Sequence, residues 1–320
     1  MAVYTHITDE ALDAFLAEYD IGQAVAFKGI AEGVSNSNFL LETTTGRFIL
    51  TVYETRTDAA DLPYFLGLME WLAKAGFPSA APVAGRDGAA LRTIDGKPCA
   101  IATFLQGLSV SRPSAAQCKE AGAGLAWLHE AAQGYQGRRP NSLGQANWAA
   151  MFAPLHWAAE ALKPGLAATI DADIAKFAAN WPHHLPRGTI HADFFPDNVF
   201  FRQGRFAAAI DFYFACHAQF AFDIAITLNA WCFEADGSFN ETKARALIAG
   251  YESRRPLTSD ERAMMPLLAH GAAMRFFLTR LADWAAPKEG ALVKLHDPLE
   301  YERKLAVHRA GLDLFGLGQA

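Results

Sequence analysis

The sequence of 320 residues is poor in several features that mark whole classes of protein. Its four cysteines include no pair with the spacing of a zinc site or a redox motif, so we expect reduced thiols in a cytoplasmic protein. No apolar run is long enough to span a bilayer, and residues 1–10 lack the pattern of a signal peptide. The formal net charge of -6 gives no general attraction to nucleic acid or to anionic membranes. We therefore expect a small-molecule partner, and the oligomeric state stays open.

Apolar residues are what the chain has in quantity: they make up 52% of it, against 19% charged residues, which is enough for a substantial core. The first hundred or so residues have the pattern of strands with one prominent helix, whereas the residues after Gly107 have mostly helical patterns. We therefore predict an α+β fold of two lobes. Residues 1–104 form a small antiparallel, nucleotide-binding β lobe with a helix, and residues 105–320 form a larger, mostly helical lobe. The hinge is Phe104–Gly107, and the cleft between lobes is the usual place for a nucleotide and a small substrate.

Local patterns place the individual elements. Capping boxes predict helix starts at Ser114, Ser238 and Thr258. A short β-rich patch is expected over 188–212. The expected strands of the first lobe are 24–30, 38–43, 47–53, 89–93 and 99–104. The expected helices are 8–19, 62–75, 114–132, 147–162, 169–180, 219–235, 240–253, 259–284 and 298–315.

A polar loop between two apolar, strand-like stretches carries the strongest chemical signal. His191, Asp193 and Asn198 stand in this loop, and Asp211 ends another apolar stretch further along. Phosphoryl transfer needs a carboxylate that orients the acceptor hydroxyl and takes its proton, together with oxygen ligands that hold Mg²⁺ against the phosphates of ATP. The spacing matches the His-Arg-Asp-x-x-x-x-Asn and Asp-Phe-Gly motifs of protein kinases. This donor set favours a hard ion such as Mg²⁺ over zinc.

A second and weaker signal is the segment 32–39, Glu-Gly-Val-Ser-Asn-Ser-Asn-Phe, between two expected strands. Its residues Gly33, Ser35, Asn36 and Asn38 suit a turn whose backbone N–H groups face phosphate oxygens. A plain β-hairpin has the same composition, so the segment gains meaning only from the loop downstream. It is not a Walker A loop, because the pattern GxxxxGK[ST] occurs nowhere in the chain.

These motifs resemble those of the aminoglycoside phosphotransferase-like superfamily, which also includes choline kinases and fructosamine kinases. Within it, the chain is similar to the homoserine kinases of that fold over nearly its whole length. The resemblance implies ATP-dependent phosphorylation of the side-chain hydroxyl of L-homoserine, a step toward threonine. An aminoglycoside, a choline-like amino alcohol or a sugar remains open as the acceptor. The matching pieces are 28–39, 46–54, 61–63, 139–141 and 191–198.

Carried over position by position, the resemblance implies a role for each motif residue. Asp193 is the catalytic base, and Asn198 and Asp211 hold Mg²⁺. Residues 33–38 cover the phosphates, and Asp223 corresponds to a buried aspartate that braces the catalytic loop. The remaining implied positions are His191, which supports the geometry of the loop, and the adenine-contacting residues Thr103, Phe104 and Leu105.

One position departs from the kinase pattern. Kinases place a lysine on the third strand to hold the phosphates, and here that position is Thr51. Lys28 or Arg56 could supply the charge, or the phosphates rely on metal and backbone. The carboxylate partner is equally open between Asp61 and Glu70. The threonine also leaves open a catalytically silent, kinase-like binding module.

The amino acid end of the substrate calls for one cation and one anion in the site. Arg275 and Asp283 stand at i and i+8 on one face of a late helix, and a guanidinium suits a carboxylate. A solvated helix stripe has the same pattern. Glu234, which follows the helix nearest the metal site, is a comparable candidate. With Asp236 and Glu241 it would also suit a polycationic aminoglycoside.

Overall fold

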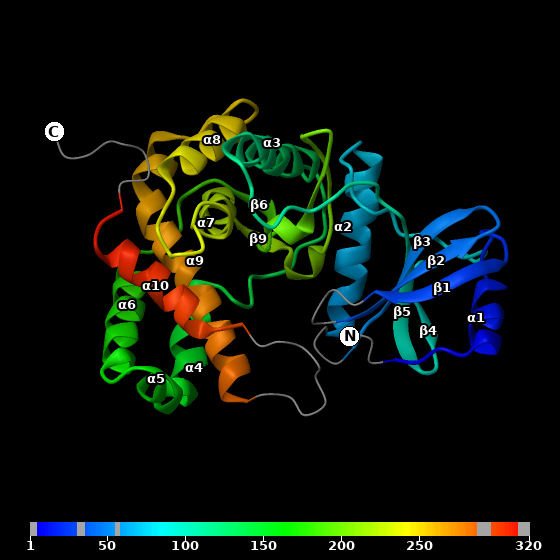
Figure 1. Cartoon of the computed structure of the whole chain (residues 1–320), viewed down its shortest axis with the longest axis horizontal. Helices are drawn as coiled ribbons and strands as arrows, with labels where there is room; N and C mark the ends of the chain where they lie inside the picture. The colour runs from blue at the N-terminus through cyan, green and yellow to red at the C-terminus, as the bar shows by residue number, and fades with distance from the viewer. Residues whose placement is uncertain (1–4, 31–35, 55–57, 287–295, 313–320) are drawn as a thin grey trace.

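The computed structural model describes residues 5–30, 36–54, 58–286 and 296–312. It has two lobes: a sheet with two helices at the N-terminal end, and a larger helical body that follows (Figure 1). This is the α+β fold that the sequence predicts. Within the described ranges, no helix combines the length and the apolar character that a membrane crossing requires. The four cysteines are free thiols, and all of them are buried.

The N-terminal lobe is built on an antiparallel sheet of five strands in the order β1-β2-β3-β5-β4. One face of this sheet packs against α1 (Asp9–Leu16), whose Leu12 and Phe15 are buried with Phe39 and Leu50. A second helix, α2 (Leu62–Lys74), stands between the sheet and the C-terminal lobe (Figure 1). The strands are β1 (Ala24–Ile30), β2 (Ser37–Thr43), β3 (Gly46–Val52), β4 (Arg92–Ile94) and β5 (Lys97–Thr103).

The register of the sheet decides which residues face the other lobe. Ile30 pairs with Asn38, Asn38 with Thr51, and Thr51 with Ala100. Directly paired residues of a sheet point to the same face, so this row shares one face. The neighbouring residues Phe39 and Leu50 are buried with α1 on the opposite face. Asn38 and Thr51 therefore lie on the face turned away from α1.

The C-terminal lobe surrounds a helix that is buried almost throughout, α7 (Phe220–Trp231). Figure 1 shows α3, α8 and α9 around it. Two small antiparallel pairs, β6 with β9 and β7 with β8, complete the lobe. The other helices are α3 (Ala115–Ala131), α4 (Trp148–Phe152), α5 (His156–Leu162), α6 (Leu166–Asn180), α8 (Glu241–Glu252), α9 (Ser259–Ala285) and α10 (Pro298–Arg309). The short strands are β6 (Arg187–Ile190), β7 (Val199–Arg202), β8 (Arg205–Ala209) and β9 (Cys216–Gln219).

Two of the three expected capping boxes are confirmed and one is wrong. The hydroxyls of Ser114 and Thr258 cap α3 and α9, and the glutamine or glutamate three residues on completes each box. Ser238 caps no helix, because its hydroxyl hydrogen-bonds the carboxylate of Asp236. Instead α8 is capped by the side chain of Asn240, which accepts a hydrogen bond from the Lys243 N–H.

The region 147–162 is not the single helix that its periodicity predicts. It divides into α4, a short 3₁₀ turn (Ala153–Leu155) and α5. Pro154 lies in that turn, and a proline ring removes one backbone donor and clashes with the preceding helical turn. The strand β9 lies beyond the predicted β-rich patch 188–212, and its pairing with β6 brings the ends of that patch together.

Candidate active site

The segment 191–198 leaves β6 and returns to β7, and it is held from both sides by its own histidine. His191 is fully buried, and its Nε2 donates a hydrogen bond to the carbonyl of Ile210 over 2.9 Å. Its Nδ1 accepts a hydrogen bond of 3.2 Å from the backbone N–H of Asp193. Burial lowers the pKa of His191, which keeps the ring neutral and fits this tautomer. Both ring nitrogens are occupied, so His191 fixes the catalytic loop against the strand that leads to Asp211.

A buried carboxylate braces the same loop from below. Asp223 on α7 accepts hydrogen bonds of 2.8 Å from the backbone N–H groups of His191 and Ala192. Ala192 has φ of +62°, a left-handed conformation that costs a non-glycine residue roughly 1–2 kcal/mol. Burial alone would raise the pKa of Asp223, but hydrogen bonds from His129 and from the backbone hold it below its ordinary value. The anion of Asp223 therefore stabilises a strained backbone at the centre of the site.

Asp193 and Asn198 are joined across the loop. The amide nitrogen Nδ2 of Asn198 donates to the Asp193 carbonyl at 2.9 Å and to its carboxylate Oδ2 at 3.1 Å. With Nδ2 used in this way, the oxygen Oδ1 of Asn198 is turned to the other side of the amide and can accept from a ligand or bind a cation. The contact orients the Asp193 carboxylate and the Asn198 oxygen at the same time.

Asp211 lies next to this pair although it comes from another strand. The N–H of Ile210 donates to the Asn198 carbonyl at 3.0 Å, which extends the pairing of β7 with β8. Asp211 itself has φ of +62°, a left-handed conformation that is uncommon outside glycine and asparagine. Its side chain stays exposed to solvent. Asp193 and Asn198 are thus in contact, and the charge of Asp211 acts on Asp193.

The carboxylates of the site perturb one another. The pKa of Asp193 is raised to about 7, chiefly by burial and further by the charges of Asp211 and Asp197, against the opposing charge of Arg275. The pKa of Asp211 is raised to about 6, first by desolvation from the surrounding protein and second by the charge of Asp197, although the side chain itself reaches solvent. Asp193 is half-buried and Asp211 is exposed, so solvent moderates both shifts. A cation among these oxygens would relieve the repulsion.

Arg275 is a buried cation that lies against the catalytic loop. It sits on α9 with 2% of its surface exposed, and its Nη1 donates to the carbonyl of Ala192. Its guanidinium stacks over Phe276 at 4.4 Å and over Phe214 at 5.3 Å. Within the described ranges, its buried Nε has no hydrogen-bond acceptor. Burial lowers the pKa of Arg275, and Asp193 is the strongest charge that opposes this shift.

The other two substrate candidates lie in different surroundings. Glu234 forms an ion pair of 2.6 Å with Lys243 and accepts a hydrogen bond from Asn240, so it supports the turn before α8. Asp283 is exposed near the end of α9. Its charge acts on His296, as does the charge of Asp197 in the catalytic loop. Asp283 therefore lies towards the loop that carries Asp197, whereas the carboxylate of Glu234 is already bonded to Lys243 and Asn240.

Asp197 is a site residue that sequence reasoning missed. It is exposed in the loop between Pro196 and Asn198, and its charge raises the pKa of both Asp193 and Asp211. The motif comparison treats this position as a spacer between the catalytic aspartate and the asparagine. Its place directly before Asn198 is the signal that could have identified it.

On the N-terminal side, the expected phosphate loop is described only in part. Gly33 and Ser35 lie outside the described residues. Asn36 is buried, and its side-chain oxygen accepts a hydrogen bond of 3.2 Å from the Glu54 N–H. Asn38 is half-buried, and its Oδ1 accepts a hydrogen bond of 2.8 Å from the hydroxyl of Thr51.

The expected hinge leaves the sheet at the end of β5. The hydroxyl of Thr103 accepts a hydrogen bond from Ala81, and the N–H of Phe104 donates to the Arg47 carbonyl. Arg47 also stacks over the Phe104 ring at 4.8 Å. Four residues after Phe104, Leu108 pairs with Phe201 of the C-terminal lobe through both backbone groups. The segment containing Leu105 therefore connects a strand of each lobe.

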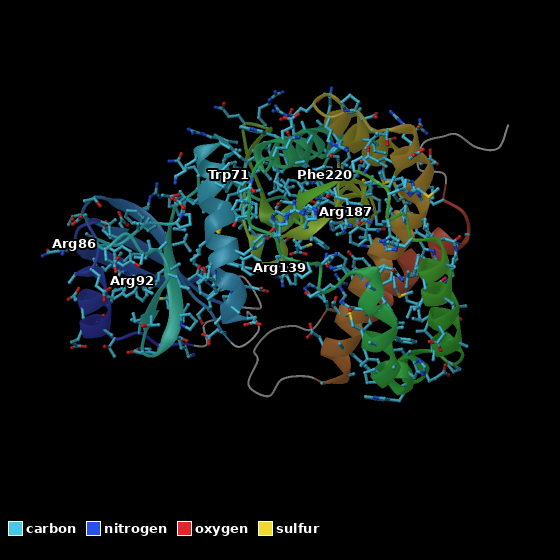
Figure 2. The ribbon with its side chains drawn as sticks, turned by 180° about the vertical axis from the view of Figure 1, so that it is seen from behind. Trp71, Arg86, Arg92, Arg139, Arg187 and Phe220 are labelled. Carbon is cyan, nitrogen blue, oxygen red and sulfur yellow. The ribbon has the colours of Figure 1, made fainter. Side chains whose placement is uncertain are left out.

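Thr51 occupies the strand position at which kinases carry lysine. The candidates for the missing positive charge are Lys28 and Arg56, and those for its carboxylate partner are Asp61 and Glu70. Lys28 is exposed on β1 and Arg56 is outside the described residues. Asp61 forms an ion pair of 2.5 Å with Arg139, which Figure 2 shows where α2 meets the C-terminal lobe. Glu70 forms an exposed ion pair with Lys74, one helical turn along α2.

The donor set fits a hard cation. One exposed carboxylate and one amide oxygen are the ligand types that Mg²⁺ prefers, and the neighbouring carboxylates have raised pKa values that a positive charge would offset. Among the residues that the structure describes, no group of three or more His, Cys, Asp or Glu side chains is arranged to hold a metal ion. The arrangement thus offers two protein oxygens, with a carboxylate beside them that can take a proton.

Known proteins resemble this chain both in sequence and in fold. A model of the phosphotransferase enzyme family matches residues 26–257. A homoserine kinase of Caulobacter sp. (strain K31) is 69% identical over 99% of this chain and 100% of its own length. A homoserine kinase of Phenylobacterium zucineum is 65% identical over 100% of this chain and 99% of its own. Among solved structures, an amicoumacin kinase in complex with AMP-PNP and Ca²⁺ shares the fold, with a TM-score of 0.70 at 17% identity over 95% of this chain and 92% of that one.

Proposed function

This chain belongs to the phosphotransferase enzyme family, and we propose that it transfers the γ-phosphoryl group of ATP to the side-chain hydroxyl of L-homoserine. The observation that carries the proposal is the 69% identity, over 99% of this chain and 100% of its relative, to a protein named homoserine kinase. The product is O-phospho-L-homoserine, an intermediate of threonine biosynthesis. A likeness in fold alone would not select this acceptor, because one fold hosts many functions.

In the proposed reaction, Asp193 is the general base. Its carboxylate orients the homoserine hydroxyl and accepts its proton as the oxygen bonds to the γ-phosphorus, while the bond from that phosphorus to the bridging oxygen breaks and ADP leaves. The hydrogen bond from Asn198 holds the carboxylate in one orientation. The raised pKa supports this role, since a base works best with a pKa close to the working pH.

We propose that Asp211 and the Oδ1 of Asn198 hold Mg²⁺. The bound ion would neutralise phosphate charge that builds up during the transfer. The chain contributes the position of the two oxygens, because the loop and the strand end are tied through His191 and Ile210. The exposed side chain of Asp211 is accessible to an ion that arrives with the nucleotide.

We propose that Arg275 binds the α-carboxylate of the amino acid. Its guanidinium lies over the rings of Phe276 and Phe214, and its Nε has no acceptor within the described ranges. A planar guanidinium binds a carboxylate through two parallel hydrogen bonds. The α-ammonium group would then face the exposed carboxylates of Asp197 and Asp283. Both carboxylates are close enough to His296 for their charges to act on its pKa.

The nucleotide is assigned to the sheet face that carries Asn38 and to the segment 103–105. We propose that the adenine lies along Thr103, Phe104 and Leu105, and that residues 33–38 cover the phosphates. The support is the position of the segment 104–108, which bonds to Arg47 at one end and to Phe201 at the other, so that an adenine beside it would lie between the two lobes.

A panel of acceptors with ATP labelled in the γ-position tests the proposal. We expect labelled phosphate on L-homoserine, with little on kanamycin, choline, ethanolamine or a hexose. Phosphorus NMR should identify the product as a phosphomonoester of the homoserine side chain. Turnover of another member of the panel without turnover of homoserine would contradict the substrate assignment, and turnover of none would contradict the phosphotransferase proposal.

A further inference from the structure

Thr51 holds the side chain of Asn38 on the neighbouring strand. The Thr51 hydroxyl donates a hydrogen bond of 2.8 Å to Oδ1 of Asn38. Just beyond the end of β3, the hydroxyl of Tyr53 lies 3.2 Å from the hydroxyl of Tyr213. Tyr213 lies two residues after Asp211, in the C-terminal lobe.

The number of hydrogens shows which part of Asn38 stays available. A hydroxyl has one hydrogen to donate, and Thr51 gives its own to Asn38. The side-chain carbonyl of Asn38 is therefore occupied, and its NH₂ group is the part that can donate to a ligand.

The end of β3 lies beside the site already described. The rings of Tyr53 and Tyr213 meet edge-on at 5.4 Å, and the charge of Asp211 acts on both tyrosines. Asn38 and Thr51 share the sheet face turned away from α1. The contact between Tyr53 and Tyr213 thus brings the end of β3, which carries Thr51, towards the Asp211 loop.

We propose that Thr51 is a positioning residue that holds the Asn38 amide as a neutral hydrogen-bond donor to the phosphates of ATP, in the place where other kinases use a lysine cation. The inference rests on the proposed use of ATP. An oriented amide supplies directed N–H donors to charged oxygens, and such hydrogen bonds are stronger than neutral ones. Charge neutralisation is then left to the metal ion, and the Asn38 amide supplies the hydrogen bonds that the lysine would give.

Calorimetric titration of the full-length protein with AMP-PNP, in the presence of Mg²⁺ and without homoserine, tests this role of Thr51. Thr51→Val keeps the side-chain volume and removes the hydroxyl, so Asn38 loses its orientation. We expect its dissociation constant for AMP-PNP to rise about tenfold, the size of one hydrogen bond to a charged group. Thr51→Ser restores a hydroxyl and should stay within about twofold of the native value. Adenosine, which lacks phosphates, should compete equally well for all variants.

Two further variants keep the test decisive. Thr93→Val makes the same change at an exposed position of β4 and should leave the affinity unchanged. Should Thr51→Val fail to fold, Asn38→Asp replaces the donor amide by an acceptor of equal size, and it should weaken AMP-PNP binding while leaving adenosine unaffected. Native affinity for AMP-PNP in folded Thr51→Val or in Asn38→Asp would overturn the inference. Because the readout is nucleotide binding, a failure of the homoserine assignment would show separately, in the acceptor panel.

Discussion

At the scale of single residues, the candidate site holds like charges close together. The charges of Asp211 and Asp197 raise the pKa of Asp193, and the charge of Asp197 raises the pKa of Asp211, in addition to the effect of burial. The opposing cation, Arg275, lies on the other side of the Ala192 carbonyl. An arriving Mg²⁺ would meet the carboxylate of Asp211. The carboxylate of an amino acid would meet Arg275, whose Nε has no acceptor within the described ranges. The residues of the loop are thus arranged for ligands that bring compensating charge.

Replacement of the proposed base should stop the chemistry and spare nucleotide binding. Asp193→Asn keeps the size of the side chain but cannot accept a proton, so we expect kcat to fall by about 10²- to 10⁴-fold. Steady-state rates with homoserine and a titration with AMP-PNP measure the two effects. Asp236→Asn, at an exposed turn outside the loop, is the matched control and should keep the native rate. A native rate in Asp193→Asn would rule out the assigned base.

The pH dependence should follow the ionisation of the same carboxylate. The free protein has Asp193 ionised only above its raised pKa of about 7, so kcat/KM should rise with pH through that value and fall below it. Asp211, with a pKa of about 6, should add a second loss of activity at lower pH. Asp197→Asn removes a like charge and should shift the acid limb to lower pH. An acid limb that does not move in this variant would contradict the coupling of these groups.

Arg275 offers a test of the amino acid end. Arg275→Lys keeps a positive charge but loses the flat, two-pronged donor, so we expect KM for homoserine to rise by about tenfold or more. The affinity for AMP-PNP should change little, because Arg275 lies on α9 and stacks on Phe276 rather than on the sheet. Equal loss of affinity for nucleotide and homoserine would indicate a collapse of the loop instead.

Much of the catalytic loop could be predicted from the sequence, because its spacing alone carries the chemistry of phosphoryl transfer. The contacts of Asp193, Asn198 and Asp211 follow from strands that return beside each other. The contact of Tyr213 with Tyr53 could not be predicted, since Tyr53 comes from the other lobe. Glu234 was a reasonable candidate by position, and its ion pair with Lys243 depends on the start of α8.

At the scale of elements, the close crossing of α3 and α8 supports the lobe that holds the catalytic loop. A Cβ atom added to Gly250 would lie 1.9 Å from the carbonyl oxygen of Lys119, and one added to Gly122 would lie 2.0 Å from that of Leu247. Backbone carbonyls cannot move aside as a flexible side chain can. Two glycines, one from each helix, therefore permit this approach. The same α3 carries His129, which bonds Asp223 at 3.0 Å beneath the loop.

This crossing predicts a large effect of a single methyl group. Gly250→Ala should destabilise the fold by about 1–3 kcal/mol through overpacking, although alanine is the better helix former. Thermal unfolding measures the change. Gly46→Ala adds the same methyl group where the nearest atoms lie at an ordinary 3.8 Å, and it should change the stability far less. An unchanged melting temperature in Gly250→Ala would show that the helices are not packed so closely.

Element boundaries show where sequence patterns suffice and where they do not. The strand 24–30 has the predicted bounds, since a hydrophobic run between turn residues defines it locally. The single helix predicted over 147–162 is wrong because one proline outweighs a helical period. The cap of α8 moved from Ser238 to Asn240 because both residues are good caps, and Asp236 engages the serine first. Choices between equivalent local signals depend on neighbours that the pattern does not show.

At the scale of the whole molecule, α2 joins the cores of the two lobes. Its Leu62 and Phe65 pack with Tyr53 beside the sheet, and its Leu68 and Leu72 belong to the core of the C-terminal lobe. The second connection is the segment 104–107, which we propose as the boundary between lobes 1–104 and 105–320. A Cβ atom added to Gly107 would lie 2.6 Å from the Cβ of Phe200, so a glycine is needed where the chain enters the second lobe.

The central claim is spatial: one carboxylate, one amide and a second carboxylate share a single ion and a single hydroxyl. A crystal structure of the chain with AMP-PNP, Mg²⁺ and L-homoserine tests it most directly. The account predicts the ion at about 2.0–2.1 Å from an oxygen of Asp211 and from Oδ1 of Asn198, and the homoserine hydroxyl within hydrogen-bond reach of Asp193. A hydroxyl bound elsewhere, or an ion that contacts neither Asn198 nor Asp211, would contradict it.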